Sequence, residues 1–328
     1  MTDLLKVENL ESRINTSKGS IYVLNGVNFK LMEGETVGIF GESGSGKTIL
    51  FSAITRDLIP PGPMVITGRL VFLRRELVAA LRSEYIKLLE KNIGIVMQDT
   101  SSQLTGDSIG KQIIERIITQ LGKKKEEARS TAIEILQRIG FPDATIRIDE
   151  NPANLSYGLG RLVSFGYAIA SNPKLLLMDE PFAGLDVIHQ SQIIELINQM
   201  RIENGISTLL TSHDPAVIAS MAQRVLVLCG GFIVEEGSVG EIFSHPEHPY
   251  TLGLFGSQRR FNNSQHSKLD YMNGFTPIFT EKPKLCPFLS RCKFSVDRCK
   301  VVNPVLKEVG IDHNVACWVD LKAGKARI

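Results

Sequence analysis

The length, composition and charge of this chain exclude several classes of protein. It has 328 residues, of which 43% are hydrophobic and 22% charged, so it can bury a large core as one large domain or two smaller ones. Its formal net charge of +2 is too small to indicate nucleic acid or an anionic membrane surface as a partner. No apolar run reaches the length of a membrane span and the first residues lack a signal-peptide pattern, so we expect a cytoplasmic chain that can still bind membrane proteins.

Strand-like runs and helical patterns alternate along most of the chain. The expected strands cover residues 21–24, 27–31, 35–40, 93–97, 175–178 and 207–210. Helices are expected from Lys47, over 123–139 and over 193–200, and residues 59–63 break the pattern. Strands that alternate with helices predict an α/β fold with a largely parallel core sheet.

The character of the chain changes after about residue 256. Residues 256–265 are polar and typical of a linker. The stretch 270–328 contains four of the five cysteines and little periodic pattern. Because it is too short to rely on an apolar core alone, it needs a covalent or metal cross-link. We therefore predict two domains, residues 1–255 and 256–328, the second small and rich in cysteine.

Residues 41–48, Gly-Glu-Ser-Gly-Ser-Gly-Lys-Thr, fit the phosphate-binding pattern G-x-x-x-x-G-K-[ST] between a predicted strand and a predicted helix. Glycines let the backbone turn tightly enough to direct several N–H groups at one anion, and the helix N-terminus adds its positive dipole end. Lys47 can reach the β- and γ-phosphates, and the Thr48 hydroxyl can ligate Mg²⁺. The predicted nucleotide-binding residues here are Gly41, Ser43, Gly44, Ser45, Gly46, Lys47 and Thr48.

A second apolar run, residues 175–178, ends in two adjacent carboxylates. The carboxyl end of a strand beside a phosphate loop is where a Mg²⁺ partner is expected. Asp179 suits the Mg²⁺ shell, since that ion prefers few carboxylates and several waters. Glu180 then suits the general base that polarises the attacking water.

Further motifs occur in the order typical of the ATPase subunits of ABC transporters, and residues 5–255 resemble that family. Gln98 matches the Q-loop, His213 the switch histidine, and residues 179–181 the end of the Walker B motif. Residues 155–159 stand where the LSGGQ-like signature belongs, and residues 183–186 match the D-loop. The resemblance implies a P-loop ABC-type ATPase domain with a mixed core sheet, helices, an antiparallel β-subdomain and a helical subdomain.

The resemblance also implies roles for single residues. Gln98 would contact Mg²⁺ and the attacking water and pass that state to a membrane subunit, so Thr48, Gln98 and Asp179 are the expected Mg²⁺ contacts. His213 would contact the γ-phosphate and help to order the transition state. An aromatic residue of the early β-region would stack on adenine, for which Tyr22 is the candidate.

The signature departs from the family pattern. Ser156 and Gly158 are retained and would approach the γ-phosphate of ATP on a partner subunit. Tyr157 replaces the first glycine and crowds a position where the backbone approaches closely, and Leu159 removes a polar side chain. We infer a weakened signature, which favours a heterodimer of two different ATPase subunits with one slow or inactive site.

Residues 237–243 and 245–251 resemble the segment that ends the ATPase core in oligopeptide/dipeptide importers. Cys286, Cys292, Cys299 and Cys317 resemble the C-terminal extension of that subfamily. None of their spacings matches the close pairs, roughly two to four residues apart, typical of structural zinc. Spacing alone leaves an iron–sulfur cluster, zinc and plain thiols equally open. The resemblance implies a [4Fe-4S] cluster, whereas Cys229 is expected to fill the core.

The sequence thus predicts the ATP-hydrolysing subunit of an oligopeptide/dipeptide ABC importer, with ATP and Mg²⁺ as ligands, at the cytoplasmic face of the membrane. Expected partners are a second ATPase subunit, transmembrane permease subunits and, indirectly, an extracytoplasmic solute-binding protein, with no nucleic acid. Oligosaccharides or metal chelates are alternative solutes.

Two alternative functions stay open. The altered signature favours an ATP-binding regulatory subunit with little hydrolysis of its own, although the intact Glu180 argues against it. The other is a soluble ABC ATPase in DNA repair or translation. Such proteins usually carry a long coiled coil or two ATPase domains, whereas here only roughly a hundred residues separate Thr48 from Leu155.

Overall fold

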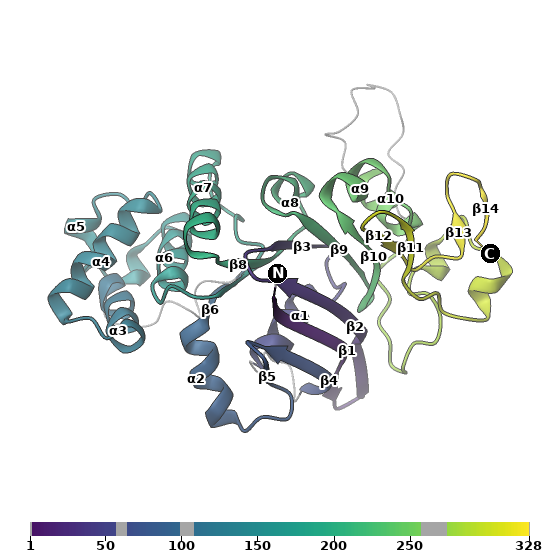
Figure 1. Cartoon of the computed structure of the whole chain (residues 1–328), viewed down its shortest axis with the longest axis horizontal. Coiled ribbons are helices and arrows are strands. Elements are labelled where there is room, and N and C mark those ends of the chain that lie inside the picture. Colours follow the sequence, from purple (N-terminus) through teal and green to yellow (C-terminus); the bar gives the residue numbers. More distant parts are fainter. Residues whose placement is uncertain (1, 57–63, 99–107, 257–273, 328) are drawn as a thin grey trace. The chain divides into compact units, whose positions relative to one another are not determined.

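The computed structural model describes residues 2–56, 64–98, 108–256 and 274–327, whose elements are labelled in Figure 1. The chain divides into two compact units. The first comprises Met1–Leu4, Leu31–Thr36 and Ala80–Thr211, and the second comprises Leu5–Lys30, Val37–Ala79 and Ser212–Ile328. The predicted break at 59–63 and residues 257–265 of the predicted linker lie outside the described residues.

An antiparallel sheet occupies part of the second unit. It contains β1 (Asp3–Thr16), β2 (Gly19–Met32), β4 (Met64–Phe72) and β5 (Arg75–Glu76) in the order β2-β1-β4-β5. β4 runs antiparallel to both β1 and β5. Much of β1 alternates buried apolar side chains such as Val7 and Leu10 with more exposed ones, as expected for a strand with one face on a core. This sheet corresponds to the β-subdomain that the family resemblance implied.

A mixed sheet also contributes strands to this unit, in the order β11-β12-β10-β9-β3. β3 (Thr36–Phe40) is parallel to β9 (Arg224–Cys229), and β9 is antiparallel to β10 (Phe232–Ser238). β12 (His313–Val315) joins β10, and β11 (Lys307–Gly310) joins β12, both antiparallel. Two strands of the cysteine-rich stretch therefore continue the sheet that begins beside the phosphate loop.

Helices and short turns complete the second unit. They are α1 (Lys47–Thr55), α8 (Pro215–Met221), α9 (Val239–Ser244), α10 (Pro249–Gly256), and the 3-10 turns η3 (Leu289–Arg291) and η4 (Asp297–Lys300). β13 (Val319–Asp320) and β14 (Lys325–Ala326) form a small antiparallel hairpin near the end of the chain.

Parallel strands form the centre of the first unit. β7 (Leu175–Asp179) pairs with β6 (Ile93–Val96) on one side and β8 (Ser207–Ser212) on the other. Every residue of β7 is buried, as expected for a central parallel strand covered on both faces. α3 (Ile109–Leu121), α4 (Lys125–Arg138) and α6 (Tyr157–Ile169) pack together as the implied helical subdomain. The remaining helices are α2 (Arg82–Asn92), α5 (Ala144–Arg147), η1 (Pro152–Asn154) and α7 (Val187–Asn204).

The observed boundaries follow local chemistry. α4 ends at Arg138, just before Gly140, whose φ of 81° an L side chain adopts only with strain. The two strands predicted at 21–24 and 27–31 are one continuous strand. Asn25 and Gly26 do not form a turn because Asn25 is buried, with its backbone N–H donating to Gly231 O at 3.0 Å and its side-chain amide donating to Gly230 O at 3.0 Å.

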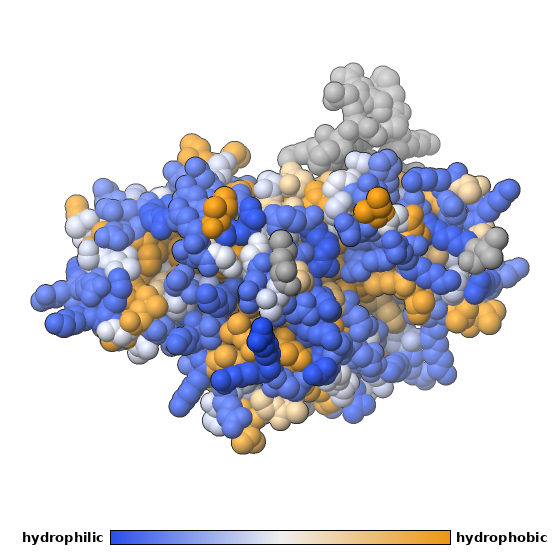
Figure 2. Space-filling model, in the orientation of Figure 1, coloured by the Kyte–Doolittle hydropathy of each residue, from blue (hydrophilic) through white to orange (hydrophobic). Residues whose placement is uncertain are grey.

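The face of the molecule shown in Figure 2 is mainly hydrophilic, with hydrophobic residues in small separate groups. Such scattered groups are normal on soluble surfaces and do not by themselves indicate a binding site. None of the helices in the described ranges is both long and apolar enough to cross a membrane.

Candidate functional site

The phosphate loop follows β3 and is held in shape by its own groups. A Cβ on Gly41 would lie 2.3 Å from Leu228 O, so only glycine fits there. Gly44 and Gly46 have φ values of 79° and 110°. Lys47 is 8% exposed, and its ammonium donates to Gly41 O at 2.7 Å and Glu42 O at 2.9 Å. These hydrogen bonds fix the loop backbone around Lys47, the residue that the sequence predicts to bind the phosphates.

The N-terminus of α1 is suited to an anion. Gly46 is its N-cap residue and supplies no side-chain cap, and no acidic residue lies in the first turn. The first N–H groups of a helix have no partner within the helix, and they carry the positive end of its dipole. This end of α1 therefore has the chemistry to hold a phosphate group.

In the first unit, the two carboxylates after β7 are positioned by Thr211 of β8. Asp179 is 1% exposed, and the Thr211 hydroxyl donates to Asp179 Oδ1 at 2.6 Å while accepting from the backbone N–H of Glu180 at 3.2 Å. Glu180 has a φ of 45°, a strained conformation for a residue with a side chain. Strain of this kind concentrates at functional sites. The sequence analysis missed Thr211, since a threonine in a strand carries no signal of its own.

The signature helix α6 contacts the backbone of the Q-loop. The Tyr157 hydroxyl donates to Gln98 O at 3.1 Å, and fully buried Arg161 donates to Gln98 O at 2.7 Å and to Met97 O. Arg161 also donates to the Tyr157 hydroxyl at 2.8 Å. The Tyr157 ring covers Gly184 of the D-loop, where a Cβ would lie 2.5 Å from ring carbons. The residue that replaces the family glycine thus joins the signature, Q-loop and D-loop within one unit, and Arg161 is a second residue that the sequence analysis missed.

The remaining predicted residues lie as follows. Ser156 caps α6 by accepting from the Leu159 N–H at 3.4 Å, and a Cβ on Gly158 would lie 3.4 Å from Gly184 O. His213 is exposed directly after β8. Tyr22 lies in β2, half-buried, with its N–H donating to Phe279 O at 2.8 Å. The structure thus groups Gln98, Ser156, Gly158, Asp179 and Glu180 in the first unit, and Tyr22, residues 41–48 and His213 in the second.

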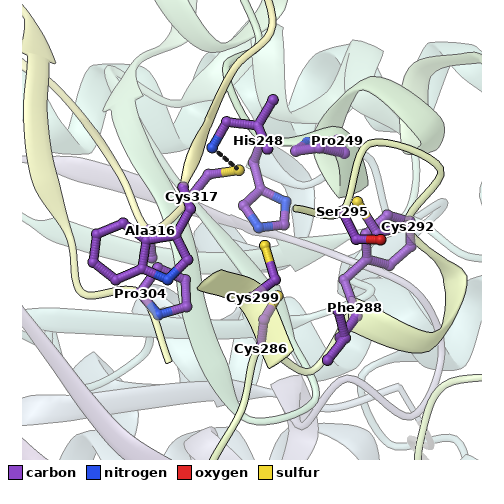
Figure 3. Close-up of a pocket in the computed structure, with 13 residues that line it drawn as sticks. His248, Pro249, Cys286, Phe288, Cys292, Ser295, Cys299, Pro304, Ala316 and Cys317 are labelled. Atoms are coloured by element: carbon purple, nitrogen blue, oxygen red, sulfur yellow. Dashed lines mark hydrogen bonds between the residues drawn. The ribbon is translucent and has the colours of Figure 1, made fainter. Parts of the chain in front are cut away.

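Cys286, Cys292, Cys299 and Cys317 line one pocket together with His248 (Figure 3). The cavity has a volume of about 20 Å³, and its exposed lining is almost entirely apolar. Burial raises the pKa of Cys286 to about 12 and that of Cys317 to about 11. Within the described ranges, no three His, Cys, Asp or Glu side chains meet in a metal-binding arrangement. Cys229 is 1% exposed and fills the core, which confirms that prediction.

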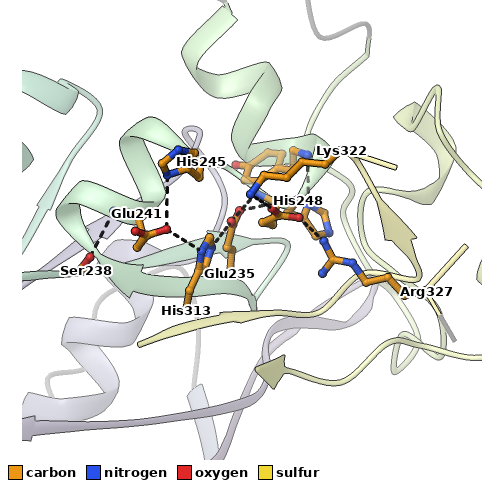
Figure 4. Close-up of polar contacts among 10 residues, drawn as sticks. Glu235, Ser238, Glu241, His245, His248, His313, Lys322 and Arg327 are labelled. Atoms are coloured by element: carbon orange, nitrogen blue, oxygen red, sulfur yellow. Dashed lines mark hydrogen bonds and ion pairs between the residues drawn. The ribbon is translucent and has the colours of Figure 1, made fainter. Parts of the chain in front are cut away.

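A buried polar network surrounds Glu235 of β10 and includes His248, which also lines this pocket (Figure 4). Glu235 is fully buried and accepts from the backbone N–H groups of Glu247, at 2.6 Å, and His248, at 3.1 Å. His313 Nε2 lies 2.7 Å from Glu235 Oε1. Arg327 pairs with the Glu247 carboxylate. The network therefore ties β10, the segment before α10 and the end of the chain together.

His248 is 1% exposed, and its Nδ1 accepts from the Tyr250 N–H at 3.0 Å. Its Nε2 is buried and has no hydrogen-bond partner among the described residues. Burial, with a smaller effect of the Arg327 charge, lowers the pKa of His248 from 6.5 to about 3. The ring is therefore neutral, and since Nδ1 accepts, Nε2 carries the proton.

We expect this histidine to make the protein less stable in acid. The unfolded chain binds a proton on His248 below pH 6.5, whereas the folded chain binds it only near pH 3. The contribution of the neutral ring to the free energy of unfolding is therefore full above pH 6.5 and is lost as the pH falls from 6.5 towards 3. At pH 5 the loss is on the order of 2 kcal/mol. Urea unfolding at pH 7.5 and 5.0 measures it. His248→Gln should reduce the difference between the two pH values, and His245→Gln, an exposed control, should not. An undiminished difference in His248→Gln would contradict the assignment.

Comparisons with known proteins agree with this arrangement. Residues 24–183 match the ABC transporter family, and residues 234–299 match the oligopeptide/dipeptide transporter C-terminal region. The chain is 35% identical to the oligopeptide transport ATP-binding protein OppD of Bacillus subtilis, over 97% of this chain and 89% of that protein. It is 34% identical to the dipeptide transport ATP-binding protein DppD of Haemophilus influenzae, over 97% and 96%.

Solved structures give the same result for the fold. The protein cbiO1 of Clostridium perfringens, part of the ABC transporter complex cbiONQ, superposes with a TM-score of 0.61 at 30% identity, over 75% of this chain and 92% of that one. A dimeric ATP-binding cassette in a post-hydrolysis state with ADP and Pi superposes with a TM-score of 0.65 at 25% identity, over 72% and 98%. The chain has the phosphate loop and the Asp179–Glu180 pair, and its relatives OppD and DppD are 35% and 34% identical to it over 97% of its length. It therefore belongs to the ATP-binding subunits of ABC transporters, in the group with the oligopeptide/dipeptide transporter C-terminal region.

Proposed function

We propose that this chain hydrolyses ATP to drive the import of peptides through transmembrane permease subunits, at the cytoplasmic face of the membrane. The observation that carries the proposal is the pair of carboxylates that Thr211 positions at the end of β7. The ATP-binding relatives OppD and DppD, named for oligopeptide and dipeptide transport, favour peptides over other solutes.

Each residue of the site has a task in this reaction. Lys47 and the N–H groups of residues 41–48 bind the phosphates of ATP. Thr48, Asp179 and Gln98 would hold Mg²⁺, which when bound neutralises phosphate charge. Glu180 accepts the proton of the water that attacks the γ-phosphorus, and the bond to the β–γ bridging oxygen breaks to release ADP. His213 steadies the γ-phosphate in the transition state. Tyr22 remains the candidate for adenine stacking.

The site needs a second ATPase subunit, and we infer that this subunit is a different chain. The Tyr157 ring stands where the family has glycine, and it is fixed by Arg161 and the Q-loop backbone. The signature of this chain is therefore a poor complement to ATP bound on the partner. A regulatory role without hydrolysis is the alternative that the same tyrosine favours.

Restoring the signature tests this inference. In the complex of the two ATPase subunits, Tyr157→Gly combined with Leu159→Gln is expected to raise ATP turnover up to about twofold, because a second site becomes active. Tyr157→Phe keeps the ring and removes only the hydroxyl bonds, so it should leave the second site inactive. The burst of ADP per complex in a single turnover counts the active sites. If both variants showed only one active site per complex, the altered signature would not be the reason that the second site is inactive.

We infer further that the four pocket cysteines hold a [4Fe-4S] cluster that cross-links the C-terminal extension, the part of the chain from residue 256 onward. Four soft sulfur donors that line one pocket suit iron–sulfur ligation, and the buried His248 Nε2 there has no hydrogen-bond partner in the described part of the chain. Iron and sulfide analysis of protein purified without oxygen tests this. About four iron and four sulfide per chain, lost in Cys299→Ser but not in Cys229→Ser, is the expected result. Zinc or bare thiols would overturn it.

Uptake of a labelled tripeptide tests the proposed transport. Cells that rely on this chain should lose uptake when Lys47→Ala replaces the native residue and keep it with Lys300→Ala, an exposed control. Unchanged tripeptide uptake with loss of oligosaccharide or metal-chelate uptake would reassign the solute. No uptake defect of any kind would favour a soluble ATPase that is not linked to transport.

A further inference from the structure

Glu42, the second residue of the phosphate loop, is held through each of its polar groups. Its backbone N–H donates to the Tyr250 hydroxyl at 2.9 Å, and its carbonyl accepts from Lys47 at 2.9 Å. Its carboxylate accepts two hydrogen bonds from Arg291, at 2.7 and 2.8 Å. The phosphate-binding pattern allows any residue at position 42, yet Glu42 is fixed here by hydrogen bonds to both its backbone and its side chain.

Arg291 reaches the loop from the C-terminal extension and is itself fixed. Its side chain is 4% exposed, and its guanidinium lies 5.4 Å from the centre of the Phe288 ring. Phe288 packs edge-on against Tyr250 with ring centres 5.4 Å apart. A partly buried guanidinium–carboxylate pair with two hydrogen bonds is stronger and better defined in geometry than a surface ion pair.

A second residue of the extension touches the same part of the loop. The Thr276 hydroxyl lies 3.3 Å from Glu42 Oε2 and 3.2 Å from Ser43 O. Arg291 ends the turn η3, in which the Leu289 N–H donates to Cys286 O and the Cys292 N–H donates to Leu289 O. The turn that carries Arg291 is thus built between two of the pocket cysteines.

The charge of Glu42 gives this contact a consequence for the ligand. The loop binds a polyanion, and a bare carboxylate within it repels the phosphates of ATP. Arg291 cancels that charge and holds the carboxylate and its backbone in place. We propose that Arg291 is a positioning residue for nucleotide binding, through which the C-terminal extension keeps the phosphate loop in its ATP-binding form. The proposal rests on the proposed ATPase function.

The proposal predicts a thermodynamic coupling between Arg291 and Glu42. Arg291→Met keeps the contact over Phe288 and removes the charge, so the Kd for ATP of the full-length chain should rise about tenfold. In the Glu42→Gln background there is no carboxylate to neutralise, so the same Arg291→Met change should alter the Kd less than about twofold. Lys300→Met, an exposed control on the same extension, should have no effect.

Equilibrium binding of a fluorescent ATP analogue measures these Kd values, and thermal unfolding without nucleotide reports the fold separately. Should Arg291→Met not fold, Arg291→Lys, which retains the charge and loses one hydrogen bond, should raise the Kd about two- to threefold. A Kd within twofold of wild type in the single variant, or equal losses in both backgrounds, would overturn the proposal. If the wild-type chain bound no ATP, the proposed function itself would fail.

Discussion

Glu180→Gln is expected to lower kcat for ATP hydrolysis about 100- to 10,000-fold, which is the range for loss of a general base, while the Kd for ATP stays within about twofold. Glutamine has the same shape and can keep the backbone bond from the Glu180 N–H to Thr211, but it cannot accept the proton of the attacking water. Steady-state phosphate release and equilibrium ATP binding, measured in the complex of two ATPase subunits, separate the two effects.

Glu195→Gln on α7 is a matched control, since that glutamate is exposed in the middle of the helix. It should leave both parameters unchanged. If Glu180→Gln retained kcat within about threefold of wild type, Glu180 would not be the base, and the regulatory function would become the better account.

Thr211→Val is expected to lower kcat about 10- to 100-fold, a typical cost when a residue that orients a ligand or carboxylate is removed. The Thr211 hydroxyl donates to Asp179 and accepts from the Glu180 N–H, so valine deletes a hydrogen bond from both functional residues at once. Losing a bond to a buried charged group also costs about 1.5–3 kcal/mol of folding stability. Phosphate release and urea unfolding measure the two losses.

The neighbouring Thr208 supplies a close control. It lies on the same strand and is fully buried, and its hydroxyl has no hydrogen-bond partner among the described residues. Thr208→Val should therefore be neutral or slightly stabilising, with kcat unchanged. Equal effects of the two substitutions would mean that strand packing, and not the Thr211 hydroxyl, sets the rate.

The sequence predicted those parts of the site that lie in short local motifs. The phosphate loop was predictable because its glycines and Lys47 form one short pattern, and the Lys47 ammonium binds the backbone of the loop itself at Gly41 O. The buried strand before Asp179 was predictable from its continuous apolar run. These features are local, so a single sequence contains the information for them.

The partners of those motifs were not predictable. Thr211, Arg161 and Arg291 each donate a hydrogen bond to a residue more than 30 positions away. The residues beside them in sequence do not indicate these partners. The cysteine spacing likewise left three possibilities open, because the shared pocket depends on how the extension folds against His248. The predicted crowding at Tyr157 missed its hydroxyl bonds to the Q-loop, which also depend on tertiary contacts.

The most direct test of the account is ATP turnover by this chain alone and mixed with its candidate partner ATPase. We predict little turnover alone, robust turnover in the mixture, and loss of that turnover when this chain carries Glu180→Gln. Robust turnover by the chain alone, dependent on its own signature, would contradict the heterodimer. Turnover that never depends on Glu180, in any mixture, would contradict the claim that this chain hydrolyses ATP.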